Sequence, residues 1–207
     1  MALFSRLICA LLLLAAASTL AAQTASGERL WHLETHGFRE RFHRDLGFDA
    51  GWGGGLSVRR ALPNTPLSIA AGLEFSRIRH NLHFVDEVIH AQVHTFSFTT
   101  ALRAMHQPFK PIGVFAKIFL EMSRFAPQPL EVDGGVLGKQ RFTADAERKL
   151  LPGIGAGVEL ELSHALAINL HISTKWLKSR APELFAEENA SVMRSVWRFQ
   201  AGLSFVF

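Results

Sequence analysis

Histidine offers the widest choice of chemistry in this chain, because imidazole binds metals and transfers protons near neutral pH. There are 10 histidines in the 207 residues. His90 and His94 would share one face of a strand, and His80 and His83 come shortly before them. No carboxylate or cysteine cluster accompanies these histidines to set a metal-ligand geometry. Histidines on surface loops are the favoured interpretation, with Zn²⁺ binding as the alternative, and we expect no metal and no other cofactor.

Two further motifs could do chemistry. Residues 152–160 contain G-x-G-x-G, but no helix or phosphate-loop pattern follows, so a nucleotide site is not indicated. His171 and Ser173 lie two residues apart, and the acidic residues Glu183, Glu187 and Glu188 follow them. Whether this pair can reach a substrate depends on the face of the element that carries it.

Period-two alternation of apolar and polar residues is the dominant pattern of the chain and indicates strands. It occurs in residues 47–59, 67–76, 95–104, 112–122, 153–162, 166–176 and 191–207. A weaker eighth segment is Arg29–Phe38, where Trp31 and Leu33 alternate with His32 and Glu34.

The connections between these segments are of two kinds, which alternate along the chain. The short ones are residues 62–65, 106–109 and 163–164, and the long ones are residues 39–45, 79–89, 124–149 and 178–190. This order is typical of a barrel with short periplasmic turns, long outward loops and both termini in the periplasm. We therefore predict an all-β fold, an eight-stranded antiparallel up-and-down transmembrane β-barrel. A soluble sandwich is the alternative, but its strands are typically shorter.

Charges in the middle of the strands belong to the polar faces, as a barrel requires, because a lipid-facing charge at midplane costs about 2–4 kcal/mol. Eight strands leave an interior just wide enough for side chains, so we expect a packed polar lumen. The predicted lumenal charge network is Glu34, Glu74, Arg103, Lys117, Glu159, Glu161, Lys175, Arg194 and Arg198. The expected pairs are Glu159 or Glu161 with Lys117 or Lys175, and Glu34 with Arg194 or Arg198.

The N-terminal segment is typical of a secretory signal peptide, with Arg6 before an apolar run at residues 7–17. We expect a signal peptide at residues 1–22 and a barrel at residues 23–207, with a retained anchor as the alternative. Cys9 is the only cysteine, so disulfides and thiol catalysis are excluded for the mature chain. No other segment is apolar for long enough to form a membrane helix. The formal net charge of +4 is too small to indicate nucleic-acid binding.

The C-terminal strand, which ends with Phe205 and Phe207 on one face, resembles the last strand of bacterial outer-membrane β-barrels. The hairpin at residues 153–176 is similar to the G-x-G-x-E hairpin of OmpA-like and opacity-type barrels. The resemblance implies a location in the Gram-negative outer membrane and contact with outer-membrane lipids. It also implies recognition by the barrel-assembly machinery through the strand ending at Phe207. It carries no catalytic residue and leaves the oligomeric state unknown.

A second resemblance concerns His171 and Ser173, because lipid A deacylase barrels carry a His-x-Ser pair followed by an acidic residue, here Glu183. That resemblance implies a triad at the lipid surface. Thr174 stands where that family has Asn, and the alternation turns His171 and Ser173 inward. We therefore favour a structural or surface-interaction role without catalysis, with the outward loop at residues 124–149 as the binding region. The alternatives are a lipid A-modifying enzyme and a narrow conduit for a small solute.

Overall fold

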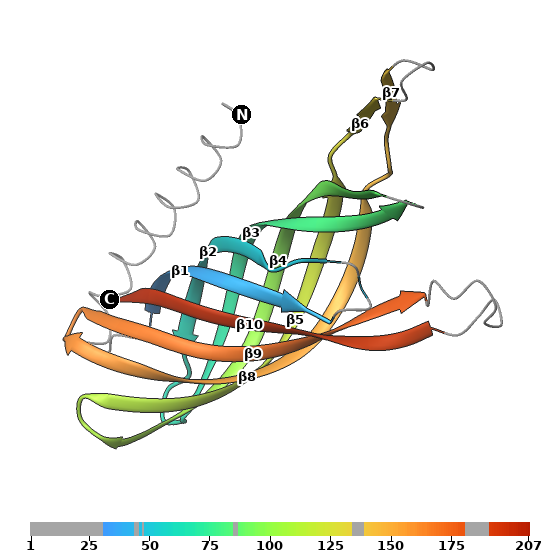
Figure 1. Cartoon of the computed structure of the whole chain (residues 1–207). Helices are drawn as coiled ribbons and strands as arrows, with labels where there is room; N and C mark the ends of the chain where they lie inside the picture. The colour runs from blue at the N-terminus through green and yellow to red at the C-terminus, as the bar shows by residue number, and fades with distance from the viewer. Residues whose placement is uncertain (1–30, 44–45, 47, 85–86, 134–138, 181–190) are drawn as a thin grey trace.

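Eight long antiparallel strands close into a barrel, and a hairpin of two short strands stands beyond one end of it (Figure 1). The computed structural model describes residues 31–43, 46, 48–84, 87–133, 139–180 and 191–207. The barrel strands are β1 (Trp31–Phe42), β2 (Gly51–Ala61), β3 (Leu67–Phe84), β4 (Glu87–Phe109), β5 (Ile112–Pro127), β8 (Glu147–Ser163), β9 (Leu166–Arg180) and β10 (Ser191–Val206). The hairpin consists of β6 (Leu130–Asp133) and β7 (Lys139–Phe142).

The predicted all-β, eight-stranded antiparallel barrel is confirmed. The expected signal peptide at residues 1–22 lies outside the described residues. None of the helices in the described part of the chain has the length and apolar character needed to cross a membrane.

The order of strands around the barrel is β1-β10-β9-β8-β5-β4-β3-β2, so the first and last strands close it. Their pairing runs from His32 opposite Val206 to Phe42 opposite Val196. Two backbone hydrogen bonds of 3.0 and 3.2 Å between Trp31 and Phe207 extend the closure. A closed ring leaves no strand edge unpaired, and unpaired backbone groups are not tolerated in hydrocarbon.

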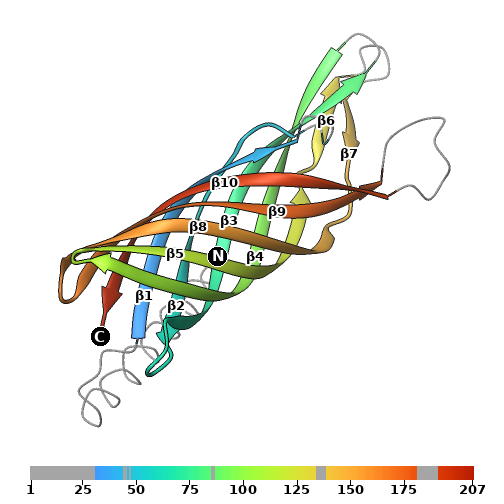
Figure 2. The same cartoon turned by 90° about the horizontal axis from the view of Figure 1, so that it is seen from below.

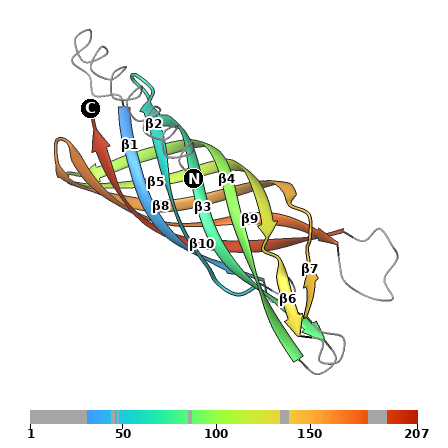
Figure 3. The same cartoon turned by 90° about the horizontal axis from the view of Figure 1, so that it is seen from above.

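The two ends of the barrel differ. The connections β2–β3, β4–β5 and β8–β9 are short and lie at the end where the C-terminus lies (Figures 1 and 3). We call this the periplasmic end. The β6–β7 hairpin stands at the opposite end, which we call the extracellular end (Figure 2). In the β2–β3 turn, Asn64 has a φ of 57°, a left-handed conformation that asparagine tolerates.

The alternation along the strands places apolar side chains outside. Ile118 is 59% exposed, and Trp197 and Phe199 on β10 are 47% and 53% exposed. Their chain neighbours Phe119 and Arg198 are buried inside the barrel. The outer surface is therefore the apolar one, which is the reverse of a protein that folds in water.

Some predicted boundaries were wrong, because the strands continue into segments expected to be loops. Residues 39–42 belong to β1, and most of the segment at 79–89 belongs to β3 and β4. Beyond the apolar band the alternation inverts, so outward positions such as Arg79 are cationic and inward ones such as Ile78 are apolar. The expected turn at 106–109 is also strand, with irregular pairing between His106 and Phe109, and the chain reverses at Lys110–Pro111.

We expect Ile118→Arg to destabilise the barrel by about 2–4 kcal/mol, because the side chain lies halfway along β5 on the lipid face. Urea unfolding in lipid vesicles measures this cost. Phe109→Arg is the matched control, since Phe109 is 61% exposed at the periplasmic end of β4 and should cost about 0–1 kcal/mol. Equal losses of unfolding free energy at the two positions would contradict the placement of Ile118 near the middle of the membrane.

Candidate functional site

A first cluster of ion pairs fills the lumen toward the periplasmic end. Arg59 donates to Glu34 through Nε at 2.8 Å and to Glu159 through Nη2 at 3.0 Å. Arg103 donates to the same Glu159 Oε2 at 2.9 Å and lies 3.5 Å from Glu34. His32 Nδ1 lies 2.9 Å from Arg59. We call these residues the periplasmic cluster, in which two carboxylates are shared between two guanidinium groups.

A second cluster lies farther toward the extracellular end and centres on Arg198. Its guanidinium donates to Glu40 at 2.6 Å, to Glu74 at 2.5 Å and to Glu121 at 3.1 Å. Lys175 Nζ lies 2.7 Å from Glu40 and 2.8 Å from Glu121. We call these five residues the Arg198 cluster. It contains three carboxylates and two cations, so its own charges leave an excess of one negative charge.

Lys117 lies in the lumen with these clusters and supplies the missing positive charge. Its Nζ donates to Nε2 of His171 at 2.9 Å, which requires a neutral imidazole as acceptor. With Lys117 included, the two clusters hold five carboxylates and five cations. Balanced charge matters here, because an unpaired charge in a closed lumen would be strongly destabilising.

Three phenylalanine rings pack between the buried cations and the barrel wall. Phe38, Phe115 and Phe119 each face an inward glycine on the next strand, namely Gly53, Gly157 and Gly153. A Cβ at any of these glycines would overlap the ring. A cation lies near the face of each ring: Arg198 at 4.2 Å from Phe38, Arg103 at 3.5 Å from Phe115 and Lys117 at 5.2 Å from Phe119. The glycines therefore create the space in which buried cations gain cation–π contacts.

A small cavity of about 60 Å³ remains in the middle of the lumen. Five buried polar atoms around it have no partner among the described residues: His36 Nδ1, Thr99 Oγ1, Arg103 Nε, Asn169 Oδ1 and Gln200 Oε1. The space and the polar lining suit a few buried waters, which would satisfy these atoms. The cavity is far smaller than the pockets that hold drug-sized molecules.

The lumen contains most of the charged residues predicted from the sequence, but with different partners. Glu34 and Glu159 pair with Arg59 and Arg103, in place of Arg194 or Arg198 and of Lys117 or Lys175. Glu161 is exposed near the periplasmic end, where its Oε1 lies 3.2 Å from Gln107. Arg194 lies near the extracellular end of β10, opposite Leu177.

Sequence reasoning left three charged members out of the network: Glu40, Arg59 and Glu121. Glu40 fell in an expected loop, while Arg59 and Glu121 already stood on inward positions of the alternation. Their place in the inward-facing set of the alternation was therefore the signal that could have identified these two residues.

His171 and Ser173 lie in this lumen. Ser173 is 3% exposed, and the ring of Phe115 packs edge-on against His171 at 5.9 Å. Both side chains belong to the inward-facing set of β9, away from lipid on the outer surface, so the geometry does not favour the deacylase-like alternative. Glu183 lies outside the described residues. In the described part of the chain, no three His, Cys, Asp or Glu side chains are grouped as metal ligands.

The extracellular part of the lumen is apolar. Its buried side chains are Phe42, Leu46, Ile78, Val93, Phe125, Leu151, Leu177 and Val196, with Phe48 packed against them. We call this group the apolar cap. Leu177 comes two residues beyond Lys175 and Phe42 two beyond Glu40, so the cap lies directly outside the Arg198 cluster. By excluding water from that side, the cap strengthens the ion pairs beneath it.

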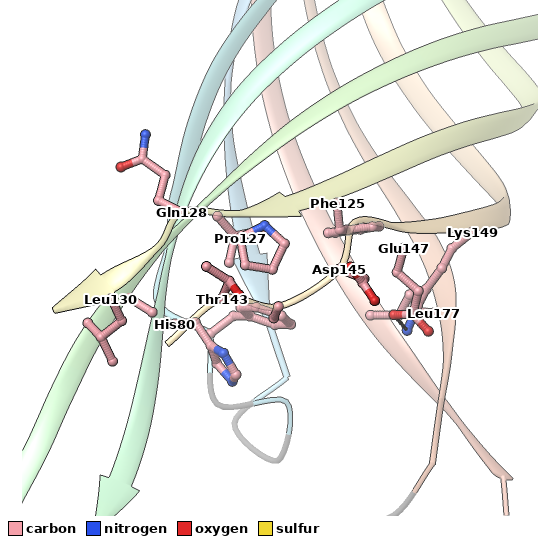
Figure 4. Close-up of a pocket in the computed structure, with 14 residues that line it drawn as sticks. His80, Phe125, Pro127, Gln128, Leu130, Thr143, Asp145, Glu147, Lys149 and Leu177 are labelled. Atoms are coloured by element: carbon pink, nitrogen blue, oxygen red, sulfur yellow. Dashed lines mark ion pairs between the residues drawn. The ribbon is translucent and has the colours of Figure 1, made fainter. Parts of the chain in front are cut away.

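A pocket of about 400 Å³ opens on the apolar cap, and we call it the mouth pocket (Figure 4). Val93, Phe125 and Leu177 line it together with Pro127 and Leu130. This volume is within the range of small-molecule sites.

Polar groups also border the mouth pocket. They are supplied by Asp145, Glu147 and Lys149, with Lys149 Nζ 2.9 Å from Glu147 (Figure 4). His80 stacks on Phe48 at 4.5 Å, beyond the apolar band, and partial burial lowers the pKa of His80. Burial disfavours the charged form of this imidazole, in keeping with an apolar lining.

The closed ring, the apolar exterior and the charged lumen define a transmembrane β-barrel. No protein-family model matches the chain, and no curated protein matches its sequence. Among solved structures, Neisserial surface protein A is 12% identical with a TM-score of 0.57, over 86% of this chain and 97% of that one. Ail, the attachment invasion locus protein of Yersinia pestis, was solved with the heparin analogue sucrose octasulfate. It is 13% identical with a TM-score of 0.50, over 87% of this chain and 99% of that one.

At these identities the similarity concerns the fold. The chain is a small eight-stranded barrel of the outer-membrane type, and its apolar exterior assigns it to the bacterial outer membrane.

Arg198→Met should destabilise the barrel by about 3–5 kcal/mol, because Glu40, Glu74 and Glu121 would lose their shared guanidinium group. The measurement is the urea midpoint in vesicles, together with the temperature at which the folded band disappears on electrophoresis. Arg60→Met is the control, since Arg60 is exposed, its guanidinium lies 5.2 Å from the centre of the Trp31 ring, and it forms no ion pair with a described side chain. An Arg198 variant as stable as the control would show that the cluster does not hold the barrel together.

Proposed function

We propose that this chain is a non-catalytic outer-membrane barrel that interacts with partners or ligands at its extracellular mouth. The observation that carries this proposal is the blocked lumen. The periplasmic cluster, the Arg198 cluster and the apolar cap occupy it in sequence, with three phenylalanine rings packed against the buried cations. A conduit would need a continuous path for its solute, and breaking paired buried charges to make one is expensive.

The mouth pocket is the feature that best suits binding. Rigid strands hold its apolar lining, and the segment between β7 and β8 adds side chains from the loop region. Binding residues are often carried by loops on a rigid scaffold. The lining favours an apolar group, such as a side chain of a partner or the alkyl part of a small molecule.

The blocked lumen predicts that the purified barrel carries no steady current in planar lipid bilayers. Arg103→Gly/Arg198→Gly, which removes one large side chain from each cluster, is the comparison and should conduct wherever it folds. Steady single-channel conductance of the wild-type barrel, at a level that the double variant does not exceed, would support the conduit instead.

The mouth pocket predicts binding of an apolar fluorescent dye such as N-phenyl-1-naphthylamine by the barrel in nanodiscs, with empty nanodiscs as the blank. Ala91→Phe should weaken this binding about tenfold or more, because Ala91 is buried against the pocket. Ala104→Phe is the matched control on the lipid face of the same strand. Equal dye binding by the two variants would exclude the pocket as the site.

We also propose that the barrel-assembly machinery recognises β10 through its C-terminal end. Phe205 is 42% exposed on the outer face, and Phe207 pairs with Trp31 at the seam where the barrel closes. Phe207→Ser should slow insertion into vesicles that contain the assembly machinery and leave unassisted folding in detergent nearly unchanged. Equal slowing in both settings would assign Phe207 to stability alone.

A further inference from the structure

The outer face of the barrel carries a one-sided set of cations at its extracellular end. Seven exposed Arg or Lys side chains occupy outward positions of the barrel strands there, and no described outward position of those eight strands beyond the apolar band is Asp or Glu. The exposed Glu131 belongs to the β6–β7 hairpin, and the exposed Glu147 of β8 pairs with Lys149. The seven cations are Arg39 and Arg41 on β1, Arg77 and Arg79 on β3, Arg124 on β5, Arg148 on β8 and Lys178 on β9. We call them the outer cationic belt. Because their chain neighbours point into the barrel, the belt faces whatever surrounds the protein.

Strand register brings these cations close together. Arg124 is directly opposite Arg148 on the paired strands β5 and β8. Arg39 and Arg77 flank Trp52, and the Arg39 guanidinium lies 5.1 Å from the centre of the indole ring. Like charges opposite each other on a sheet repel. Among the described residues, none of the seven forms an ion pair with an acidic side chain, so no described carboxylate offsets this repulsion.

The belt lies at the boundary of the apolar band. On β3, Phe75 is 50% exposed and Arg77 is the next outward residue. On β5, Met122 is 54% exposed and Arg124 is the next. Side chains at this level meet the headgroups of the outer leaflet, where phosphate is the anionic group that arginine binds best, through two parallel hydrogen bonds.

The periplasmic end provides an internal comparison. Its exposed cations in the described part of the chain are Arg60 and Lys110. If lysine and arginine were present only to anchor a barrel at an interface, both ends would carry similar numbers. The excess at one end matches a membrane whose outer leaflet is the more strongly anionic of the two.

We propose that the outer cationic belt binds the phosphate groups of lipid A in the outer leaflet, with Arg124 and Arg148 holding one phosphate between them. The bound phosphate relieves the repulsion between the two guanidinium groups. The shell of lipid A thereby fixes the depth of the barrel below the mouth pocket. This inference is independent of the proposed function, because the belt and the pocket share no residue.

The test compares Arg124→Gln/Arg148→Gln with Arg60→Gln/Lys110→Gln, which removes the same charge from the periplasmic end. Each full-length barrel is placed in phosphatidylcholine nanodiscs and titrated with lipid A, dephosphorylated lipid A or inorganic phosphate. Two cations at about 1 kcal/mol each correspond to lipid A binding roughly thirty-fold weaker in the belt variant. The periplasmic variant should bind lipid A as the wild type does.

Four results would overturn the proposal. The first three are equal lipid A affinity in the two variants, dephosphorylated lipid A that binds as tightly as lipid A, and a belt that binds a soluble sulfated polysaccharide but not lipid A. Inorganic phosphate that displaces lipid A at comparable concentrations would reduce the belt to a site for free anions and would also overturn it. If the first belt variant fails to fold, Arg77→Gln/Arg79→Gln on β3 provides the same comparison.

Discussion

The narrow lumen is the constraint on which the rest of the structure depends. Eight strands enclose too little space for a water column, so each lumenal charge must find its partner among side chains. The Arg198 cluster and the periplasmic cluster meet this demand across the barrel, since Arg198 on β10 contacts Glu121 on β5. The inward glycines follow from the same constraint, because only a residue without a side chain leaves room for a ring and a cation.

The outer surface of the barrel meets lipid within the membrane and water toward the extracellular end. In the membrane, apolar side chains point outward and charges point inward, as at Trp197 and Arg198. Toward the extracellular end, Arg79 points outward while Ile78 and Leu177 are buried inside. The outer part of the same strands therefore has the core of an ordinary water-soluble barrel. This inversion explains why an apolar pocket can open toward water at the end of a polar lumen.

The fold could be predicted because lipid enforces a simple alternation, which Phe199 and Ile118 obey. The strand ends could not, since the inversion removes the outward apolar residues on which the pattern relies, as at Arg39. The ion pairs could not be assigned because their members sit on strands that are not neighbours, for example Arg59 on β2 and Glu159 on β8. Such contacts depend on the stagger of strands around the ring, which no single-strand pattern contains.

The length of β4 has a consequence for what the protein can touch. Its 23 residues span about 75 Å at roughly 3.3 Å per residue. Even at a tilt of about 45°, that is on the order of 50 Å of height, against an apolar band of about 25 Å. The β3–β4 hairpin therefore rises well clear of the hydrocarbon as paired backbone, which is stiffer than a loop. The hairpin therefore holds its own contacts at a fixed distance from the bilayer, and only molecules that reach that height can meet its tip.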